Sequence, residues 1–315
     1  MPRTDLQLGF GLPVSGSWAT PENLASFARR AEQLGYASLW SFQRLLNPAE
    51  GDYGPQYRSV HDPLIALAYA AAVTDGIRLG TAVVNAPFYA PIVLAKQLIS
   101  LDILTGGRLD VGLGLGWSPE EFQAVGVPYD RRGARVAEFV RCLRAIFAEN
   151  PVQFDGEFYD LPPVTIDPRP VQQPGPPLLL GGGAERALRR VGRIADGWIS
   201  ASRHDLTKIG AAVTTVKEAA AEAGRDPEAL RFIVRGVIHL DEEKPTEDGG
   251  RRPLTGSEAQ IREDLEALDD QGITEVFLDL NFNPRVGSPD VDPAESTTYA
   301  ERVLETFSPK ATELG

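Results

Sequence analysis

The chain has 315 residues, of which 43% are hydrophobic and 24% charged, a composition typical of a globular enzyme with a large core. Its 44 acidic residues outnumber its 31 basic ones, and the net charge of -13 argues against nucleic acid or an anionic membrane as a partner. A small anionic ligand held by a local cluster of arginines is compatible with this charge. Because the sequence has no long apolar run, we expect no signal peptide and no transmembrane helix. The single cysteine, Cys142, excludes an internal disulfide and favours a cytoplasmic location.

Short apolar runs alternate along the chain with longer segments in which apolar residues recur three and four positions apart. Strands are expected at residues 6–12, 37–42, 77–84, 109–116, 177–182, 197–202, 232–240 and 275–280. Helices are expected at residues 21–34, 63–73, 91–104, 119–125, 132–147, 185–194, 206–223, 257–268 and 298–307. This α/β alternation predicts a parallel sheet, and at this length a closed (β/α)₈ TIM barrel that forms one domain over residues 1–315.

Two segments, at about 44–61 and 151–176, are too long to be plain connections. The second contains short aromatic runs on both sides of Asp155 and Gly156, which predicts a β-hairpin, and then proline-rich chain. We interpret both segments as insertions that leave the C-terminal ends of strands, where barrel active sites are built. They are expected to form walls or a lid over the site.

Two glycine-rich stretches are candidate ligand contacts. Gly112, Gly114 and Gly116 alternate along the fourth expected strand, so they project to one face; tight barrel packing and a flat ring lying against the strand end explain this equally well. Gly181, Gly182 and Gly183 stand between a strand and a helix. Backbone amides exposed there can bind a phosphate, with positive charge nearby from Arg186, Arg189 and Arg190. A glycine turn beside a solvated basic face is the alternative.

Other common catalytic patterns are absent from the sequence. The histidines His61, His204 and His239 show no metal-ligand spacing, and no G-x-S-x-G motif is present. Arg235 stands among apolar residues of the seventh expected strand. If its side chain points into the barrel, it must pair with a carboxylate such as that of Asp279, because an unpaired buried charge is costly.

The chain resembles the luciferase-like monooxygenase superfamily along its whole length. The resemblance rests on GFGLP (9–13), AEQLGYASLW (31–40), IRLGTAV (77–83), FDGEFYDL (154–161) and LLLGGG with ADGW (178–198). Its most specific part is AKQLISLDILTGGRLDVGLGLGW at 95–117. This resemblance implies a TIM barrel with an insertion, with FMN or coenzyme F420 lying across its C-terminal mouth.

The resemblance also implies which residues hold the coenzyme. They are Gly11, Thr81, Ala82, Val83, Asn85, Gly114, Leu115, Gly116, Trp117, Gly181, Gly182 and Gly183. Family members often have a non-proline cis peptide that supports the ring, and we place it at Ala82–Val83, with Val83–Val84 as the neighbouring alternative. Asn85 can bond the ring edge or the substrate, or it is simply a turn residue.

The choice between the two coenzymes rests on Gly114-Leu115-Gly116-Trp117. FMN-dependent members often carry a basic residue within this motif, whereas the form with Leu115 is more similar to F420-dependent members. The resemblance therefore favours an F420-dependent oxidoreductase that transfers a hydride between the deazaflavin and a small organic substrate. An FMN-dependent two-component monooxygenase, or a non-catalytic binding barrel, is the alternative. A homodimer and a separate flavin or deazaflavin reductase are expected by family analogy alone.

The second expected strand departs from the F420-dependent pattern. Many relatives have an acidic residue and a histidine after the tryptophan of this strand, but here Trp40 is followed by Ser41, Phe42, Gln43 and Arg44. Arg44 stays protonated, so it can polarise a carbonyl but cannot move a proton; a salt bridge at the barrel rim is the other interpretation.

The remaining candidates for catalysis lie at the end of this strand and in the insertion that follows. Gln43 can position the substrate or the coenzyme edge. His61, Tyr53 and Tyr57 are candidate proton donors, although simple loop packing is the favoured interpretation of each. The predicted catalytic set is therefore Gln43, Arg44 and His61.

Overall fold

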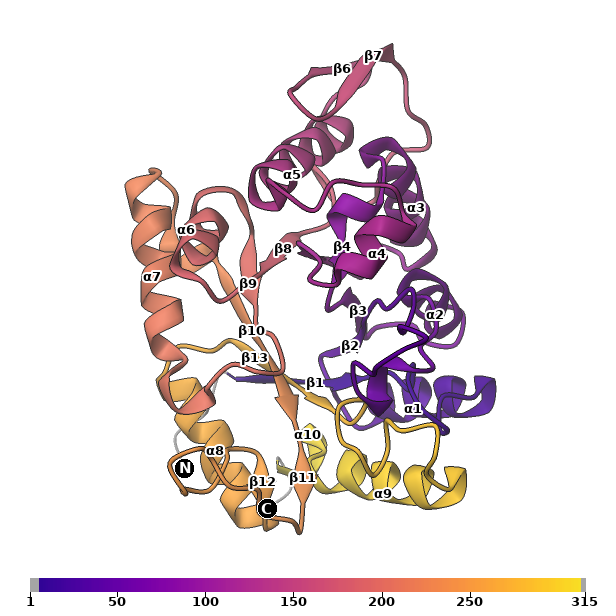
Figure 1. Ribbon diagram of the computed structural model, residues 1–315, viewed down its shortest axis with the longest axis vertical. Helices are drawn as coiled ribbons and strands as arrows, with labels where there is room; N and C mark the ends of the chain where they lie inside the picture. The colour runs from indigo at the N-terminus through magenta and orange to yellow at the C-terminus, as the bar shows by residue number, and fades with distance from the viewer. Residues whose placement is uncertain (1–5, 313–315) are drawn as a thin grey trace.

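The computed structural model describes residues 6–312 and has a central ring of strands surrounded by helices (Figure 1). The barrel strands are β1 (Gln7–Gly11), β2 (Ser38–Ser41), β3 (Arg78–Thr81) with its continuation β4 (Val84–Asn85), β5 (Leu109–Gly114), β8 (Leu178–Gly181), β9 (Gly197–Ile199), β10 (Arg231–Val237) and β13 (Glu275–Asp279). Neighbouring strands pair in parallel, and β13 pairs with β1, which closes the ring. The predicted (β/α)₈ barrel is confirmed.

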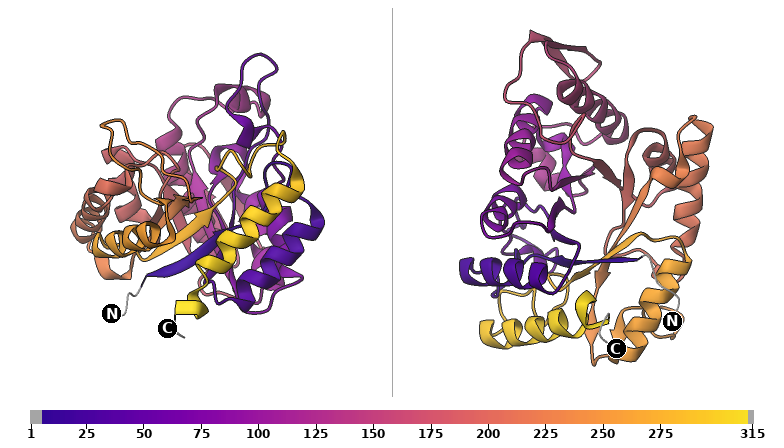
Figure 2. Two further views of the ribbon diagram at one scale, coloured as in Figure 1. Left: turned by 90° about the horizontal axis from the view of Figure 1, so that it is seen from below. Right: turned by 180° about the vertical axis from the view of Figure 1, so that it is seen from behind.

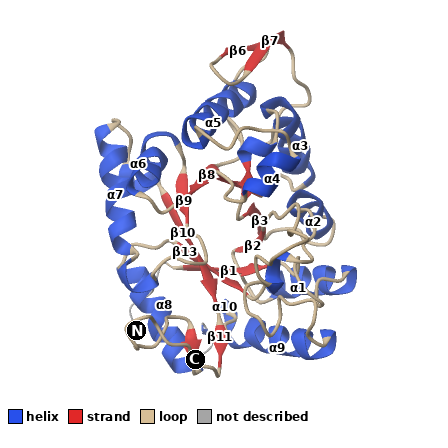
Figure 3. Cartoon of the chain, viewed as in Figure 1, coloured by secondary structure: helices blue, strands red, loops and turns tan. Residues whose placement is uncertain are grey.

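The helices alternate with the strands and cover the outside of the barrel, as Figure 2 and Figure 3 show from other directions and by element type. They are α1 (Pro21–Gln33), α2 (Pro63–Ala71), α3 (Pro91–Leu104), α4 (Pro119–Ala124), α5 (Arg132–Ala148), α6 (Glu185–Ile194), α7 (Gly210–Glu222), α8 (Glu258–Asp270), α9 (Pro293–Thr306) and α10 (Pro309–Thr312). None of the helices within residues 6–312 is long and apolar enough to cross a bilayer.

Several helices have an acidic or hydroxyl residue as their N-cap and a proline as their first residue. The Asp62 carboxylate accepts hydrogen bonds from the first-turn amides of α2, and Asp292 does the same for α9. A proline is well suited to the next position because its missing N–H would have no partner there. α9 therefore begins five residues before the predicted 298. The segment predicted to be helical from residue 206 starts as a 3₁₀ turn, η3 (Leu206–Lys208), and becomes α7 only at Gly210.

Two apolar layers hold the barrel together. The larger one fills the space between strands and helices. The smaller one lies inside the ring and consists of Trp40, Ala82, Leu179, Ile199, Ile233 and Phe277, all at most 4% exposed. Below it, Arg231 bonds Asp110 (2.7 Å) and Glu275 (3.0 Å), so these buried carboxylates are paired. The inner apolar layer forms the floor on which any ligand at the mouth must rest.

The two insertions have different positions. Residues of the first, Arg44 and Tyr57, line the cavity at the barrel mouth. The second forms the predicted antiparallel hairpin, β6 (Val152–Asp155) with β7 (Asp160–Val164). The idea that this hairpin leaves a strand end and walls the site is wrong, because it follows α5 and packs on it: the Glu138 carboxylate accepts amide hydrogen bonds from the hairpin turn. Its residues do not line the cavity described below.

Two predicted strands are divided. The third ends at Thr81 and resumes at Val84, and between them the Ala82–Val83 peptide is cis, as the family resemblance predicts. The seventh ends at Val237, after which β11 (His239–Leu240) pairs with β12 (Thr255–Gly256) outside the barrel.

Candidate active site

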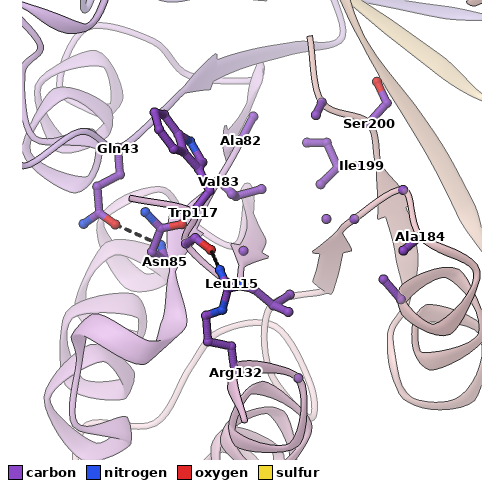
Figure 4. A pocket seen from close by; sticks show the side chains of 18 of the residues that line it. Gln43, Ala82, Val83, Asn85, Leu115, Trp117, Arg132, Ala184, Ile199 and Ser200 are labelled. Atoms are coloured by element: carbon purple, nitrogen blue, oxygen red, sulfur yellow. Dashed lines mark hydrogen bonds between the residues drawn. The ribbon is translucent and has the colours of Figure 1, made fainter. Parts of the chain in front are cut away.

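A cavity of about 790 Å³ opens at the C-terminal ends of the barrel strands. Its walls come from the ends of β2, β3, β5, β8, β9 and β13 and the residues just after them, from Asn85 of β4 and Arg235 of β10, and from the first turns of α5 and α6. Figure 4 shows side chains from these elements converging on one space. The predicted residues that line it are Gln43, Arg44, Ala82, Val83, Asn85, Gly114, Leu115, Gly116, Trp117, Gly181, Gly182 and Gly183.

The floor of the cavity is apolar and is fixed by a buried arginine. Ala82, Val83 and Ile199 belong to or pack on the inner layer. The guanidinium of Arg235 donates to the Ala82 carbonyl and pairs with Asp279, with Nη1 2.8 Å from Oδ2. The predicted Arg235–Asp279 pair is therefore confirmed, and it holds the carbonyl of the cis peptide in place.

Packing accounts for all three alternating glycines of β5 and its continuation. A Cβ on Gly112 would overlap the carbonyl oxygen of Thr81, and one on Gly114 would lie 2.5 Å from the Val83 side chain. Gly116 has a φ of 72° and would meet Phe122. Of the two explanations left open by the sequence, barrel packing is sufficient, so these glycines by themselves say nothing about a ligand.

Gly181 is different, because packing does not require it. The nearest atoms to a Cβ built there are the Leu113 and Ile199 carbonyl oxygens at 3.7 and 3.8 Å and Val83 at 3.8 Å, which is ordinary contact distance. Because Gly181 lines the cavity, a longer side chain would extend into it. The neighbouring Gly182 has a φ of 138°, and its carbonyl accepts a hydrogen bond from Trp198 Nε1 (2.7 Å). The turn before α6 is thus anchored by Trp198 and carries no side chain from residue 181 to 183.

Four arginines and Asp130 line the same end of the cavity. Arg131 pairs with Glu157, which leaves three arginines: Arg132, Arg186 and Arg190. Arg132 donates to the Gly116 carbonyl at 2.7 Å, and none of the three forms an ion pair with a carboxylate of the described residues. Burial, and then the charge of Arg186, lower the pKa of Arg190. Unpaired guanidinium groups beside free backbone amides make this end suitable for an anion. Arg189, also expected here, instead bonds Glu222 on the outside of the barrel.

Both polar atoms of the Gln43 side-chain amide form hydrogen bonds within the protein. Its Oε1 accepts a hydrogen bond from the Asn85 amide nitrogen (2.9 Å), and its Nε2 donates to the Tyr89 hydroxyl (2.6 Å). Gln43 therefore positions β4, whereas the side chain of Asn85, 7% exposed, faces the cavity (Figure 4). Asn85 is the better placed of the two for direct contact with a ligand.

Arg44 is both an ion-pair partner and part of the cavity wall. Its Nη1 lies 2.9 Å from Glu121 Oε2, with side chains 4% and 0% exposed, and its Cζ lies over the rings of Trp117 (4.4 Å) and Tyr57 (4.6 Å). Burial raises the pKa of Glu121, with Arg44 acting in the opposite direction. The predicted rim salt bridge is present, and it holds a permanent positive charge at the cavity.

Three predicted residues lie outside the cavity. His61 is exposed, and its Nε2 is 2.8 Å from the Ala19 carbonyl oxygen, so the first insertion carries it away from the mouth. Gly11 faces inward, where a Cβ would lie 2.7 Å from Asp279 Oδ1. Thr81 bonds the backbone of Gly112 in both directions and supports the floor from behind.

Sequence reasoning missed several cavity residues. Arg132 and Ser200 are examples: Ser200 directly follows β9 and so had a detectable signal, namely a polar residue at a strand's C-terminal end. Arg132 is the first residue of α5, and α4 lies between this helix and β5. Helical periodicity therefore could not show that the Arg132 side chain reaches the cavity. Within residues 6–312 no group of three or more His, Cys, Asp or Glu side chains could hold a metal.

These features fit an elongated coenzyme with a flat ring and an anionic tail. The apolar floor at Val83 provides a surface for a ring, and the side-chain-free turn from Gly181 with its unpaired arginines provides a site for a phosphate. Both ends belong to one continuous cavity, so they can be occupied by one molecule.

Comparison with known proteins identifies the family. The luciferase-like monooxygenase family profile matches residues 7–247. Protein Rv0953c of Mycobacterium tuberculosis, described only as uncharacterized, is 34% identical over 245 residues, which cover 74% of this chain and 85% of that protein. An FMNH(2)-dependent dimethylsulfone monooxygenase of Pseudomonas putida is 33% identical over 204 residues, 64% of this chain and 53% of the other.

Two solved structures have the same fold. Monooxygenase RslO1 from Streptomyces bottropensis superposes with a TM-score of 0.77 at 24% identity, covering 97% of this chain and 100% of its own. The coenzyme F420-dependent tetrahydromethanopterin reductase of Methanopyrus kandleri gives 0.72 at 18% identity, covering 96% and 98%. On the extent of the profile match and the identity to its relatives, the chain belongs to the luciferase-like monooxygenase family.

Proposed function

We propose that this protein is an oxidoreductase that binds coenzyme F420 in the 790 Å³ cavity and transfers a hydride between it and a small organic substrate. The observation that carries the proposal is the pairing, in one cavity of an acidic protein, of an apolar floor with an open glycine turn flanked by unpaired arginines. F420 supplies hydride transfer at a ring carbon when bound.

The ring end, which is the part of the cavity at Val83 where we place the coenzyme ring, is lined mainly by apolar side chains. Val83, Leu115 and Ile199 offer apolar contact, and Asn85 offers one amide for a polar ring edge (Figure 4). Arg235 keeps the Ala82 carbonyl oriented, so the floor does not change shape when a ligand arrives.

The tail end, which is the part of the cavity at Gly181–Gly183 and the three unpaired arginines, favours F420 over FMN because of its positive charge. FMN ends in a single phosphate, whereas F420 continues past its phosphate into carboxylates. Arg132, Arg186 and Arg190 carry three positive charges, whereas one phosphate carries at most about two negative charges. Leu115, where FMN-dependent members often carry a basic residue, agrees with this preference.

Arg44 is the residue we assign to substrate polarisation. Its guanidinium cannot transfer a proton near neutral pH, but held by Glu121 and the Trp117 ring it can stabilise negative charge that develops on a substrate oxygen. Tyr57 also lines the cavity and carries a hydroxyl that could exchange a proton. Neither His61 nor any other histidine of the described chain lines this cavity.

The second candidate is an FMN-dependent two-component monooxygenase supplied by a separate reductase. The similarity to the Pseudomonas putida dimethylsulfone monooxygenase favours it. The same cavity would serve, because the ring and phosphate of FMN need the same two ends.

Equilibrium fluorescence titration with F420, FMN and riboflavin tests the proposal. We expect F420 to bind more tightly than FMN, and FMN more tightly than riboflavin, which lacks the phosphate. Tight FMN binding with consumption of oxygen in the presence of a flavin reductase would favour the second candidate. If riboflavin binds as tightly as F420, the assignment of the arginine end is wrong.

A further inference from the structure

A second cavity, of about 410 Å³, adjoins the first. The two share Ser202 and Phe282 in their walls. Phe282 belongs to the ring end: it packs on Phe42 with ring centroids 5.0 Å apart, and the Arg235 guanidinium lies 4.4 Å from its ring. The second cavity therefore adjoins the residues that fix the floor of the first.

Three of the nine side chains that line this second cavity are cationic. Arg203, Lys244 and Arg252 contribute three positive charges in a protein whose net charge is -13. Among the described residues, Glu242 is the carboxylate that pairs with one of them, Lys244. A focused positive field in an acidic protein attracts anions and repels cations.

Four of the residues that line this cavity belong to an arm, residues 239–256, that runs from β11 to β12. The amide of Arg252 donates to the Lys244 carbonyl (2.7 Å), which brings these two residues of the arm side by side. The arm is tied to α8 by Arg251, which bonds both carboxylate oxygens of Asp264 at 2.8 and 2.7 Å. The two cations are thus held in place rather than displayed on a free loop.

A buried histidine gives an independent sign that a ligand completes this site. His239 lines the cavity and is 4% exposed, yet its Nδ1 has no hydrogen-bond partner. Glu242 Oε2 is 3.6 Å away, beyond a normal hydrogen bond. Buried polar atoms are nearly always bonded, so an unsatisfied ring nitrogen beside three cations indicates a missing polar partner.

We propose that the second cavity binds an anionic group, a carboxylate, sulfonate or phosphate, carried by the substrate. This inference rests on the proposed function for the reaction that follows. A substrate anchored at Arg203, Lys244 and Arg252 extends past Phe282 toward the floor at Ala82 and Val83. The phosphate end at Gly181 to Gly183 and its arginines stays available to the coenzyme. Substrates are then selected by their acidic group before any chemistry.

The test compares anionic and neutral probes of the same shape on the F420-loaded protein. Isothermal titration with benzoate, benzenesulfonate and neutral benzamide is made on the wild type, on Arg203→Gln and on Arg203→Gln/Lys244→Gln. Arg29→Gln, an exposed cation on α1, is the matched control. We expect the acids to bind at least about tenfold more weakly for each cation removed, since each charged hydrogen bond contributes at that level. Benzamide binding and the control are expected to stay unchanged.

Two results would overturn the proposal or assign the site differently, and a third would overturn the proposed function alone. If the wild type binds benzoate no better than benzamide, or the double variant binds it as well as the wild type, the cavity is not an anion site. If the double variant loses affinity for F420 but not for FMN, the cavity holds the acidic tail of the coenzyme, and the substrate assignment is wrong. If neither coenzyme binds the wild type, the proposed function fails, while the same probes on the coenzyme-free protein still decide the anion site.

Discussion

Replacing Gly181 with leucine tests whether the cavity is a coenzyme site. A Cβ at this position has no neighbour closer than 3.7 Å, so the fold accepts it, but the rest of the side chain must enter the cavity. Forcing extra carbon atoms into filled space costs about 1–3 kcal/mol, which corresponds to roughly 5- to 150-fold weaker coenzyme binding. The free energy of unfolding of the coenzyme-free protein should change by less than about 0.5 kcal/mol.

Fluorescence titration measures the affinity of each variant for F420. Thermal melting of the coenzyme-free protein measures the change in its stability. Gly76→Leu is the matched control, because Gly76 is exposed, its nearest atom to a built Cβ is also 3.7 Å away, and it lies outside the cavity. The reasoning is refuted if Gly181→Leu binds F420 with wild-type affinity while remaining folded.

Three further predictions concern charged groups. Arg186→Gln/Arg190→Gln should weaken F420 binding by about tenfold or more without changing riboflavin binding. Arg235→Met should lower the free energy of unfolding by about 3–5 kcal/mol by leaving Asp279 unpaired, and adding Asp279→Asn should recover part of the loss. Burial, followed by nearby cations, lowers the pKa of His239 from 6.5 to about 4, so stability present above pH 6.5 is lost as the pH falls toward 4, on the order of 3 kcal/mol.

Each of these has its own measurement and control. The arginine pair is compared with Arg29→Gln in titrations at low and high salt, and an equal loss of riboflavin affinity would mean general damage to the cavity. Urea unfolding measures Arg235→Met; an undiminished loss in the double variant would show that Asp279 is not its cause. Urea unfolding from pH 7.5 to 4 measures the histidine effect. His239→Gln should show a shallower pH dependence, and an identical slope contradicts the assignment.

The barrel could be predicted from the sequence because its signal is repeated along the chain. Each apolar run followed by a helical period marks one βα unit, and errors at single boundaries, such as the late start assigned to α9, do not alter the count. The cis peptide at Ala82–Val83 came from the family resemblance and is confirmed, but no periodicity could show that it divides the third strand into β3 and β4.

The site was harder to predict because it depends on the direction in which side chains point. Arg186 and Arg190 are four residues apart and share a face of α6, which faces the cavity, whereas Arg189 belongs to another face and pairs with Glu222. Sequence proximity to a strand end placed His61 near the mouth, but the path of the insertion carries it to Ala19. The basic arm at Lys244 and Arg252 gave no motif at all.

The most direct test of the account is a crystal structure of the protein with F420 bound. We predict the deazaflavin ring against Val83, between Leu115 and Ile199, and the tail phosphate within hydrogen-bonding distance of the amides of Gly182 and Gly183. A ring bound elsewhere on the barrel, or a phosphate turned away from this glycine turn, would contradict the account.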